Sequence, residues 1–198
     1  MTRFLSWYEQ EDGTDLVVKA GLAHLWFVTL HPFDDGNGRI ARALSDMALA
    51  RSEQTSQRFY SLSAQMQHER SEYYQTLERT QKRELTVTEW MSWFLDCLQR
   101  ALERSEETLS RVLTKAKYWE RLRGVPMNAR QIKVLNRLLD GFDGKLTTSK
   151  WAKLAKCSQD TAHRDILALM QFDALAKAEG GGRSTHYELV FEEIDWLC

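Results

Sequence analysis

The sequence predicts a mainly α-helical protein built from two domains. Helix-forming residues dominate its 198 positions, only two prolines occur, and strand-like alternation is scarce. The pattern changes after the Gly-Val-Pro stretch at 124–126, where shorter segments replace long helical ones. We therefore predict a helical bundle over residues 1–105, a linking helix over 106–124, and a small winged helix-turn-helix domain over 125–198.

The bundle is predicted to begin with a short helix around residues 4–10 and a longer one over 16–30. Thr14 or Asp15 can cap the second helix. Apolar residues cover almost its whole circumference, which predicts a central, buried helix. The helix should end at His31, because the residue before a proline disfavours the helical conformation. Another helix is predicted to begin near Asn37 or Gly38.

Further helices are predicted over 63–81, 88–104 and 105–123. The last is strongly charged, and its length leaves a homodimer open. Within the bundle, His24 is predicted to be a hydrogen-bonded core residue and the aromatic cluster at 90–94 to be core. The remaining segments outline a winged helix: helices at 129–139, 149–155 and 158–170, then a hairpin tipped by the glycines at 180–182.

Composition excludes several classes of function. The formal net charge is -1, so no overall field attracts the chain to nucleic acid or to an anionic membrane. Three widely spaced cysteines argue against a disulfide framework and fit a reducing cytoplasm. No signal peptide is recognisable, and the longest apolar stretch is too short to span a bilayer. We predict a cytoplasmic protein with no membrane partner.

The twelve residues from His31 to Arg42 carry the chemistry. They join the end of the predicted buried helix to the start of the next helix. A helix N-terminus offers free backbone N–H groups and a partial positive charge. Gly36 and Gly38 allow the backbone to approach a ligand closely. Together these features predict an anion site that suits phosphate.

The charged residues of this segment sharpen the prediction. Arg39 and Arg42 share one helix face near a positive helix end, an arrangement that suits a polyphosphate. Asp35 can hold Mg²⁺ beside the phosphates, and His31 can serve as a general base. The set fits phosphoryl or nucleotidyl transfer. It is not a Walker A loop, because the Gly-Lys-Ser/Thr ending is absent.

The segment resembles the signature of the Fic (Fido) family, His-x-Phe-x-Asp/Glu-Gly-Asn-Gly-Arg-x-x-Arg, at all its fixed positions. The resemblance covers roughly residues 1–105. The C-terminal part resembles winged-helix modules that are appended to many bacterial Fic proteins. The resemblance implies transfer of AMP from ATP to a Tyr, Thr or Ser side chain of a target protein, with release of pyrophosphate. ATP and an unidentified target protein are the implied partners, and Mg²⁺ is the implied cofactor.

The resemblance also implies roles around the reacting atoms. His31 would deprotonate the target side chain, Phe33 would pack inward and fix the loop, and Asp35 would ligate Mg²⁺. Tyr73 and Tyr74 resemble a tyrosine pair near the nucleotide pocket of the family. Packing in the core is the other reading of these two tyrosines.

The phosphates are implied to lie on the second half of the motif. Gly36, Asn37 and Gly38 would cradle the α- and β-phosphates. Arg39 would bind phosphate, and Arg42 would reach the γ-phosphate. These five residues, with the tyrosine pair and Phe33, form the predicted nucleotide-binding set.

Two features of the family are predicted to be missing. Family members place a β-hairpin flap, which docks the target backbone, upstream of the motif. Only 30 residues precede His31 and they read as two helices, so we predict an N-terminally shortened Fic protein without the flap. The inhibitory motif Ser/Thr-x-x-x-Glu-Gly/Asn is also predicted to be absent. Thr80 with Glu84 and Ser184 with Glu188 have the spacing, but leucine follows each glutamate.

Other functions stay open at this stage. One alternative is a non-catalytic or regulatory protein whose Fic part senses a nucleotide and whose winged helix binds a partner or DNA. Another is a Fic variant that transfers a different phosphorylated group or removes AMP. Both keep the nucleotide site and differ in what happens there.

DNA binding through the winged helix is not favoured. Residues 125–198 carry ten Lys and Arg against ten Asp and Glu, whereas DNA-binding domains usually display a basic face. Gln159, His163 and Arg164 can read bases from the predicted recognition helix. Asp160 and Asp165 on the same helix would repel phosphate. A protein-docking or dimerising role is preferred.

Overall fold

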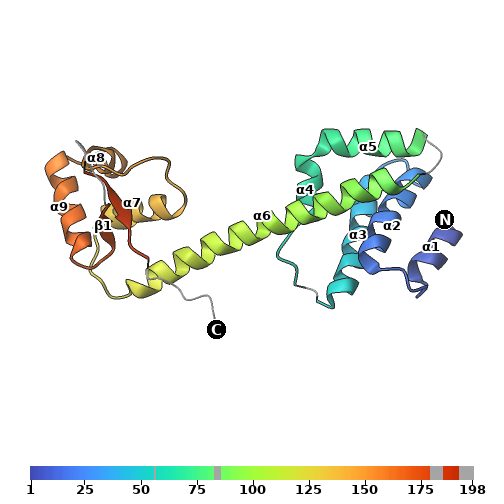
Figure 1. Cartoon of the computed structure of the whole chain (residues 1–198), viewed down its shortest axis with the longest axis horizontal. Helices are drawn as coiled ribbons and strands as arrows, with labels where there is room; N and C mark the ends of the chain where they lie inside the picture. Colours follow the sequence, from blue (N-terminus) through green and yellow to red (C-terminus); the bar gives the residue numbers. More distant parts are fainter. Residues whose placement is uncertain (56, 83–85, 179–184, 192–198) are drawn as a thin grey trace. The chain divides into compact units, whose positions relative to one another are not determined.

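The computed structural model describes residues 1–55, 57–82, 86–178 and 185–191. The chain is mainly helical, as predicted, and divides into two compact units, Met1–Thr108 and Leu109–Cys198 (Figure 1). Helix α6 (Thr88–Arg121) contributes residues to both. In the described ranges, no helix has the length and hydrophobicity needed to cross a membrane.

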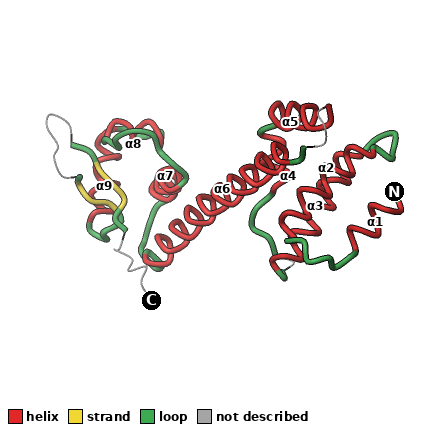
Figure 2. The backbone as a smooth tube through the Cα atoms, turned by 45° about the vertical axis from the view of Figure 1, so that its right-hand side comes forward, coloured by secondary structure: helices red, strands yellow, loops and turns green. Residues whose placement is uncertain are grey.

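The first unit is a helical bundle. Figure 2 shows its helices, which are separated by loops: α1 (Thr2–Glu9), α2 (Leu16–Leu30), α3 (Asn37–Glu53), α4 (Leu62–His68), α5 (Arg70–Lys82) and the first part of α6. Asp15 caps α2, since its carboxylate accepts from the N–H groups of Val17 and Val18 at 2.8 and 3.1 Å. The predicted helix over 16–30 is confirmed at both ends.

Two predicted helix boundaries were wrong. The segment predicted as one helix over 63–81 forms α4 and α5, which meet at Glu69. The Glu69 carboxylate accepts two hydrogen bonds from the Arg100 guanidinium, at 2.6 and 2.7 Å, and so binds this junction to α6. Conversely, the helices predicted over 88–104 and 105–123 are one helix, α6, whose sequence contains no glycine or proline to interrupt it.

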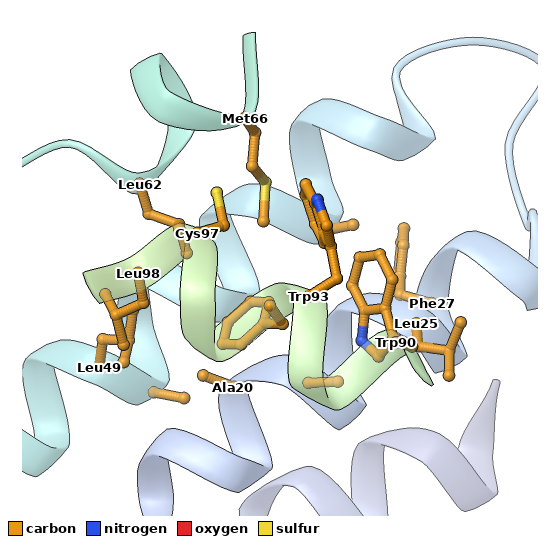
Figure 3. Packing of buried hydrophobic residues seen from close by; sticks show 14 of the residues in the cluster. Ala20, Leu25, Phe27, Leu49, Leu62, Met66, Trp90, Trp93, Cys97 and Leu98 are labelled. Carbon is orange, nitrogen blue, oxygen red and sulfur yellow. The ribbon is translucent and has the colours of Figure 1, made fainter. Parts of the chain in front are cut away.

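The core of the first unit is built around α6. Figure 3 shows Trp90 and Trp93 beside Leu25 and Phe27 of α2. The Trp90 indole N–H donates to the Gly21 carbonyl of α2 at 2.8 Å. A Cβ at Gly21 would lie 2.9 Å from side-chain atoms of α6, so this glycine allows the two helices to approach. The prediction that the 90–94 cluster is core is confirmed, because the Trp90, Trp93 and Phe94 side chains are buried.

The second unit combines three helices with a small antiparallel sheet. They follow in the order α7 (Ala129–Leu139), α8 (Thr148–Ala155), α9 (Gln159–Met170), β1 (Leu175–Lys177) and β2 (Tyr187–Leu189). Leu175 pairs with Leu189 in the sheet, and Trp151 is fully buried in the core. A capping box at Asn128 starts α7, and Ser158 caps α9.

These elements match the helices and the hairpin predicted for this region. The predicted glycine tip of the hairpin lies within residues 179–184, outside the described residues. The winged-helix classification therefore stays a prediction.

Candidate active site

The loop between α2 and α3 begins where α2 ends, at His31. His31 adopts a left-handed conformation, with φ 45° and ψ 54°, and its N–H donates to the Phe27 carbonyl at 3.1 Å. Positive φ is uncommon outside glycine. Pro32 follows and prevents the helix from continuing. As a result, an exposed imidazole is held at the end of a buried helix.

Asn37 holds the loop from the inside. Its side-chain oxygen accepts from the Phe33 N–H at 3.0 Å, and its side-chain amide donates to the Phe33 carbonyl at 2.5 Å. Asn37 is buried, so these bonds are shielded from water. Its side chain therefore positions the loop, and its backbone N–H lies at the first position of α3, where helix N–H groups have no acceptor within the helix.

The prediction that Phe33 packs inward was wrong. Its ring was expected to pack inward, but 49% of the residue is exposed. The ring centroid lies 6.3 Å from that of the buried Phe27 ring. The loop is held by the two hydrogen bonds between the Asn37 side chain and the Phe33 backbone rather than by burial of the Phe33 ring.

Six of the ten predicted site residues surround one cavity of about 410 Å³. They are His31, Asn37, Gly38, Arg42, Tyr73 and Tyr74. The cavity lies at the N-terminal end of α3, where the first N–H groups have no acceptor within the helix. Arg42 brings a guanidinium to the same space. The arrangement can bind an anion with backbone and side-chain donors together.

The other four predicted residues are Phe33, Asp35, Gly36 and Arg39, and they do not line this cavity. Asp35 and Arg39 form an ion pair with 3.0 Å between their side-chain oxygen and nitrogen, and both side chains are largely exposed. Gly36 has φ 85°, a conformation that favours glycine, and it begins α3. The exposed pair therefore belongs to the outer side of the loop.

Asp35 is the carboxylate of the motif that suits a metal ion. In the part of the chain that the structure describes, no group of three or more His, Cys, Asp or Glu side chains converges on a metal position. Mg²⁺ commonly uses one or two carboxylates and takes its other ligands from phosphates and water. The single carboxylate of Asp35 fits that pattern only together with a bound phosphate ligand.

A buried polar network lies next to the cavity wall. His24 is fully buried, with Nδ1 3.2 Å from the Ser45 hydroxyl and Nε2 2.9 Å from the Tyr73 hydroxyl. The Ser45 hydroxyl also lies 3.1 Å from the carbonyls of Ala20 and Ala41. Donation from Ser45 to a carbonyl leaves its oxygen to accept from His24 Nδ1–H, and the Tyr73 hydroxyl then donates to Nε2. The prediction that His24 is a hydrogen-bonded core residue is confirmed.

Burial sets the protonation of this network. Desolvation lowers the pKa of His24 to about 3, with a smaller contribution from the nearby Arg42 charge. Desolvation also raises the pKa of Tyr73 to about 12, against the opposing effect of Arg42. Both groups are therefore neutral at pH 7, and the Tyr73 hydroxyl is used inside the protein while its residue forms part of the cavity wall.

The sequence reasoning missed four residues of the cavity wall. They are Val28 of α2 and Leu77, Glu78 and Gln81 of α5. Gln81 is held in place because its side-chain amide donates to the Thr29 hydroxyl at 3.1 Å. The α5 residues share a face with Tyr74, since they follow it by three, four and seven positions. Helical spacing from the predicted tyrosine pair was the signal that could have found them.

The predicted recognition helix, α9, differs from expectation at one acidic residue. Asp165 is buried, and its carboxylate accepts from the Asn128 amide at 2.9 Å and from the Arg130 guanidinium at 3.1 Å. It therefore does not present a charge that would repel phosphate. Asp160 and Arg164 are exposed on the same helix.

Comparison with known proteins finds similarity over the first part of the chain. The Fic/DOC family model matches residues 1–49, which include the whole segment from His31 to Arg42. Relatives named protein adenylyltransferase Fic from Drosophila grimshawi and Drosophila virilis are 31% identical over 105 residues. The aligned part is 52% of this chain and 20% of each relative. The chain thus spans about a fifth of the length of the curated relatives that it matches.

Proposed function

We propose that this chain binds ATP with Mg²⁺ and transfers AMP to a hydroxyl side chain of a protein. One observation carries the proposal: His31, Arg42 and the N-terminal end of α3 surround the same cavity. This juxtaposition brings together a base, a phosphate-binding cation and backbone donors. The match of residues 1–49 to the Fic/DOC family and the relatives named adenylyltransferase support the same reaction.

The phosphates would bind at the start of α3. Backbone N–H groups at Asn37 and Gly38 point from the first turn, where no acidic residue competes. Arg42 lies one turn further along the helix and would meet the γ-phosphate. Arg39 would have to leave Asp35 to contact phosphate, because these two side chains are paired across the loop.

Mg²⁺ would be held by Asp35 together with phosphate oxygens. When bound, the ion would neutralise charge on the phosphates. If the Asp35–Arg39 ion pair opened, the Asp35 carboxylate could bind Mg²⁺ and the Arg39 guanidinium could bind a phosphate. The exposed ion pair is weak enough for this exchange, because exposed pairs contribute only about 0–1 kcal/mol.

His31 would act on the attacking hydroxyl. A target oxygen attacks the α-phosphorus, and the bond from that phosphorus to the α–β bridging oxygen breaks. Pyrophosphate leaves, and the proton of the hydroxyl passes to an imidazole nitrogen of His31. The left-handed conformation at the end of α2 holds that imidazole at the edge of the cavity.

The role of His31 is tested by labelling. With radiolabelled ATP, Mg²⁺ and cell lysate, the wild-type chain should label itself or a target protein. His31→Ala should abolish labelling and keep nucleotide binding, since it removes the base and leaves the phosphate donors. His68→Ala, in the exposed last turn of α4, is a matched control and should label normally. Equal labelling by wild type and His31→Ala would reject the catalytic role.

Arg42 should make the largest side-chain contribution to the affinity for ATP. Arg42→Ala should weaken ATP binding about 10- to 100-fold, because charged hydrogen bonds contribute about 1.5–3 kcal/mol. ADP binding should fall less, since ADP has no γ-phosphate. Isothermal titration measures both, and Arg39→Ala, which removes an exposed guanidinium outside the cavity wall, should have a smaller effect. Equal losses for ATP and ADP would separate Arg42 from the γ-phosphate.

A second candidate is a nucleotide-binding protein that does not transfer AMP. It is favoured by Asp35 and Arg39, which pair with each other and do not line the cavity. In this case ATP would bind with the Arg42 dependence given above, and no labelling would occur. The two experiments together therefore separate the candidates.

A further inference from the structure

The second unit has a hollow between α7 and α8 whose lining is rich in cations. Its volume is about 460 Å³, and its lining includes Lys133, Asn136, Arg137, Asp140, Lys153 and Leu154. The first four come from α7 and the residue that follows it, and the last two come from α8. All of them belong to the unit Leu109–Cys198, so the hollow, called here the basic hollow, is a feature of that unit alone.

Three cations of the basic hollow have no acidic partner among the described residues. Lys133, Arg137 and Lys153 are exposed, and no carboxylate that the structure describes forms an ion pair with any of them. Arg130 of the same helix, by contrast, is paired with Asp165. An anion that enters the basic hollow would be attracted by the three cations together.

The remaining polar side chains add to this positive character. The Asn136 side-chain oxygen accepts from the Trp119 indole N–H at 3.2 Å, so the amide N–H groups of Asn136 are left as donors. Asp140 is the acidic residue of the lining, and its carboxylate accepts from the Lys115 ammonium group at 2.7 Å. The basic hollow therefore offers hydrogen-bond donors and positive charge around one paired carboxylate.

Helix stability explains only part of this charge. Arg137 and Lys153 lie in the last turns of α7 and α8, where a cation interacts favourably with the helix dipole. Lys133 lies in the middle of α7, so the dipole gives no reason for a third cation beside them. The gathering of all three around one concave surface therefore indicates an anionic ligand.

The spacing of the cations and the apolar part of the lining fit an acidic peptide. Four residues advance a helix by about 6 Å, which separates Lys133 from Arg137 along α7. Alternate side chains of an extended peptide are about 7 Å apart, so two carboxylates separated by one residue would meet these two cations. Leu154 is half-buried in the same lining and offers an apolar surface to a further side chain of the peptide.

Nucleic acid is the other polyanion that a basic surface can bind. A helix-turn-helix domain inserts its second helix into the major groove, and in this unit that helix would be α9. None of the residues that line the basic hollow lies on α9. A leucine among the cations also contributes nothing to contacts with phosphates, whereas a peptide can carry an apolar side chain beside its acids. These observations favour a protein partner.

We propose that the basic hollow is a docking site for an acidic segment of another protein, in which two carboxylates one residue apart lie beside an apolar side chain. Lys133, Arg137 and Lys153 would bind the carboxylates, and Leu154 would contact the apolar side chain. The proposal does not depend on the reaction proposed for the cavity of the first unit, since the two sites share no residue.

Fluorescence anisotropy of the full chain tests the site. The probe is a labelled peptide, Ser-Glu-Glu-Leu-Glu-Glu-Ser, which should bind with a dissociation constant of about 10–100 μM at low salt. Lys133→Glu with Arg137→Glu should weaken binding about 10-fold or more, and Lys153→Glu alone about 3-fold, because repulsion replaces attraction. Lys145→Glu with Arg164→Glu is the matched control, since it makes the same change of charge as the double variant at exposed positions outside the basic hollow. This control should bind like the wild type, and circular dichroism checks that each variant keeps its helix content.

Two further measurements test the chemistry of the partner. A peptide with serine in place of its leucine should bind about 3-fold more weakly, because the contact with Leu154 is lost. A short DNA duplex with the same label should bind more weakly than the peptide at the same salt concentration.

Each part of the proposal has a result that would overturn it. Failure of the wild-type chain to bind the peptide, or equal binding by the variant with Lys133→Glu and Arg137→Glu, would overturn the site. Equal binding of the serine peptide would overturn the contact with Leu154. Tighter binding of the duplex than of the peptide, lost in the same double variant, would identify nucleic acid as the ligand and overturn the choice of a protein partner.

Discussion

The two compact units each bury a tryptophan at the centre of the core and surround it with different chemistry. Trp90 in the first unit donates to the Gly21 carbonyl at 2.8 Å, and its ring lies 5.3 Å from the buried His24 ring. The indole nitrogen of Trp151 in the second unit has no hydrogen-bond partner among the described residues. Polar groups are thus built into the first core, where they support a cavity wall. In the second unit, polar bonds lie at helix caps and also inside the core, where the Tyr118 hydroxyl donates to the Ala174 carbonyl at 2.7 Å.

The units also differ in charge. Residues 1–108 contain twelve Lys and Arg against seventeen Asp and Glu, and residues 109–198 contain fifteen against eleven. The net charge of the whole chain conceals this difference. The candidate anion site lies in the acidic unit, so its binding must come from local donors such as Arg42 and the start of α3. Overall charge is a poor guide to where an anion binds.

Removing the central tryptophan of either core should destabilise its own unit strongly. Trp90→Ala and Trp151→Ala should each cost about 3–5 kcal/mol, because both remove a fully buried ring. Hydrogen exchange should rise mainly in α2, α3 and α5 for Trp90→Ala, and mainly in α7 and α9 for Trp151→Ala. Mass spectrometry of exchanged peptides measures both. If either change raised exchange equally throughout, the units would unfold as one.

Acid should weaken the first unit through His24. Its folded pKa is about 3, below the ordinary value near 6.5, so the unfolded chain binds a proton that the folded chain does not. Stability should therefore fall as pH drops from 6.5 toward 5, before most carboxylates titrate. Urea unfolding at several pH values measures the slope. His24→Gln, which keeps hydrogen bonding without this titration, should show a smaller slope, and identical slopes would contradict the assignment.

Removing a helix cap should destabilise each unit by a smaller amount. Asn128→Ala should destabilise the second unit by about 1 kcal/mol, because it removes the capping box of α7 and the bond to Asp165. Asp15→Ala is the matched change in the first unit, where the carboxylate caps α2. Each loss should appear as faster exchange at the start of its own helix. Faster exchange at the other cap would show that the two units are coupled.

Local signals allowed the helices to be predicted closely. Asp15 and Asn128 start helices because their side chains accept from nearby N–H groups, and Pro32 ends one because its ring excludes the helical conformation before it. The His31–Arg42 segment is local in the same sense, since its residues are neighbours in the chain. The position of this segment at the N-terminus of one helix follows from the sequence alone.

Distant contacts decided the rest. The division between α4 and α5 accompanies the Glu69–Arg100 bond, whose partners are 31 residues apart. Sequence spacing could not show that Asp165 turns inward to Arg130. Such outcomes depend on which groups meet after the chain has packed.

Local sequence patterns were therefore enough to predict the mainly helical fold and most helix ends, and they located a segment that we expect to bind an anion. Packing decides how the residues of the His31–Arg42 segment are placed: Asn37 is buried, Phe33 is half exposed, and Asp35 lies outside the cavity that Arg42 lines. Only the tertiary structure placed one face of α5 opposite the motif. The physical reason is that caps and turns act within a few residues, whereas burial and cavity walls are set by side chains that meet from distant parts of the chain.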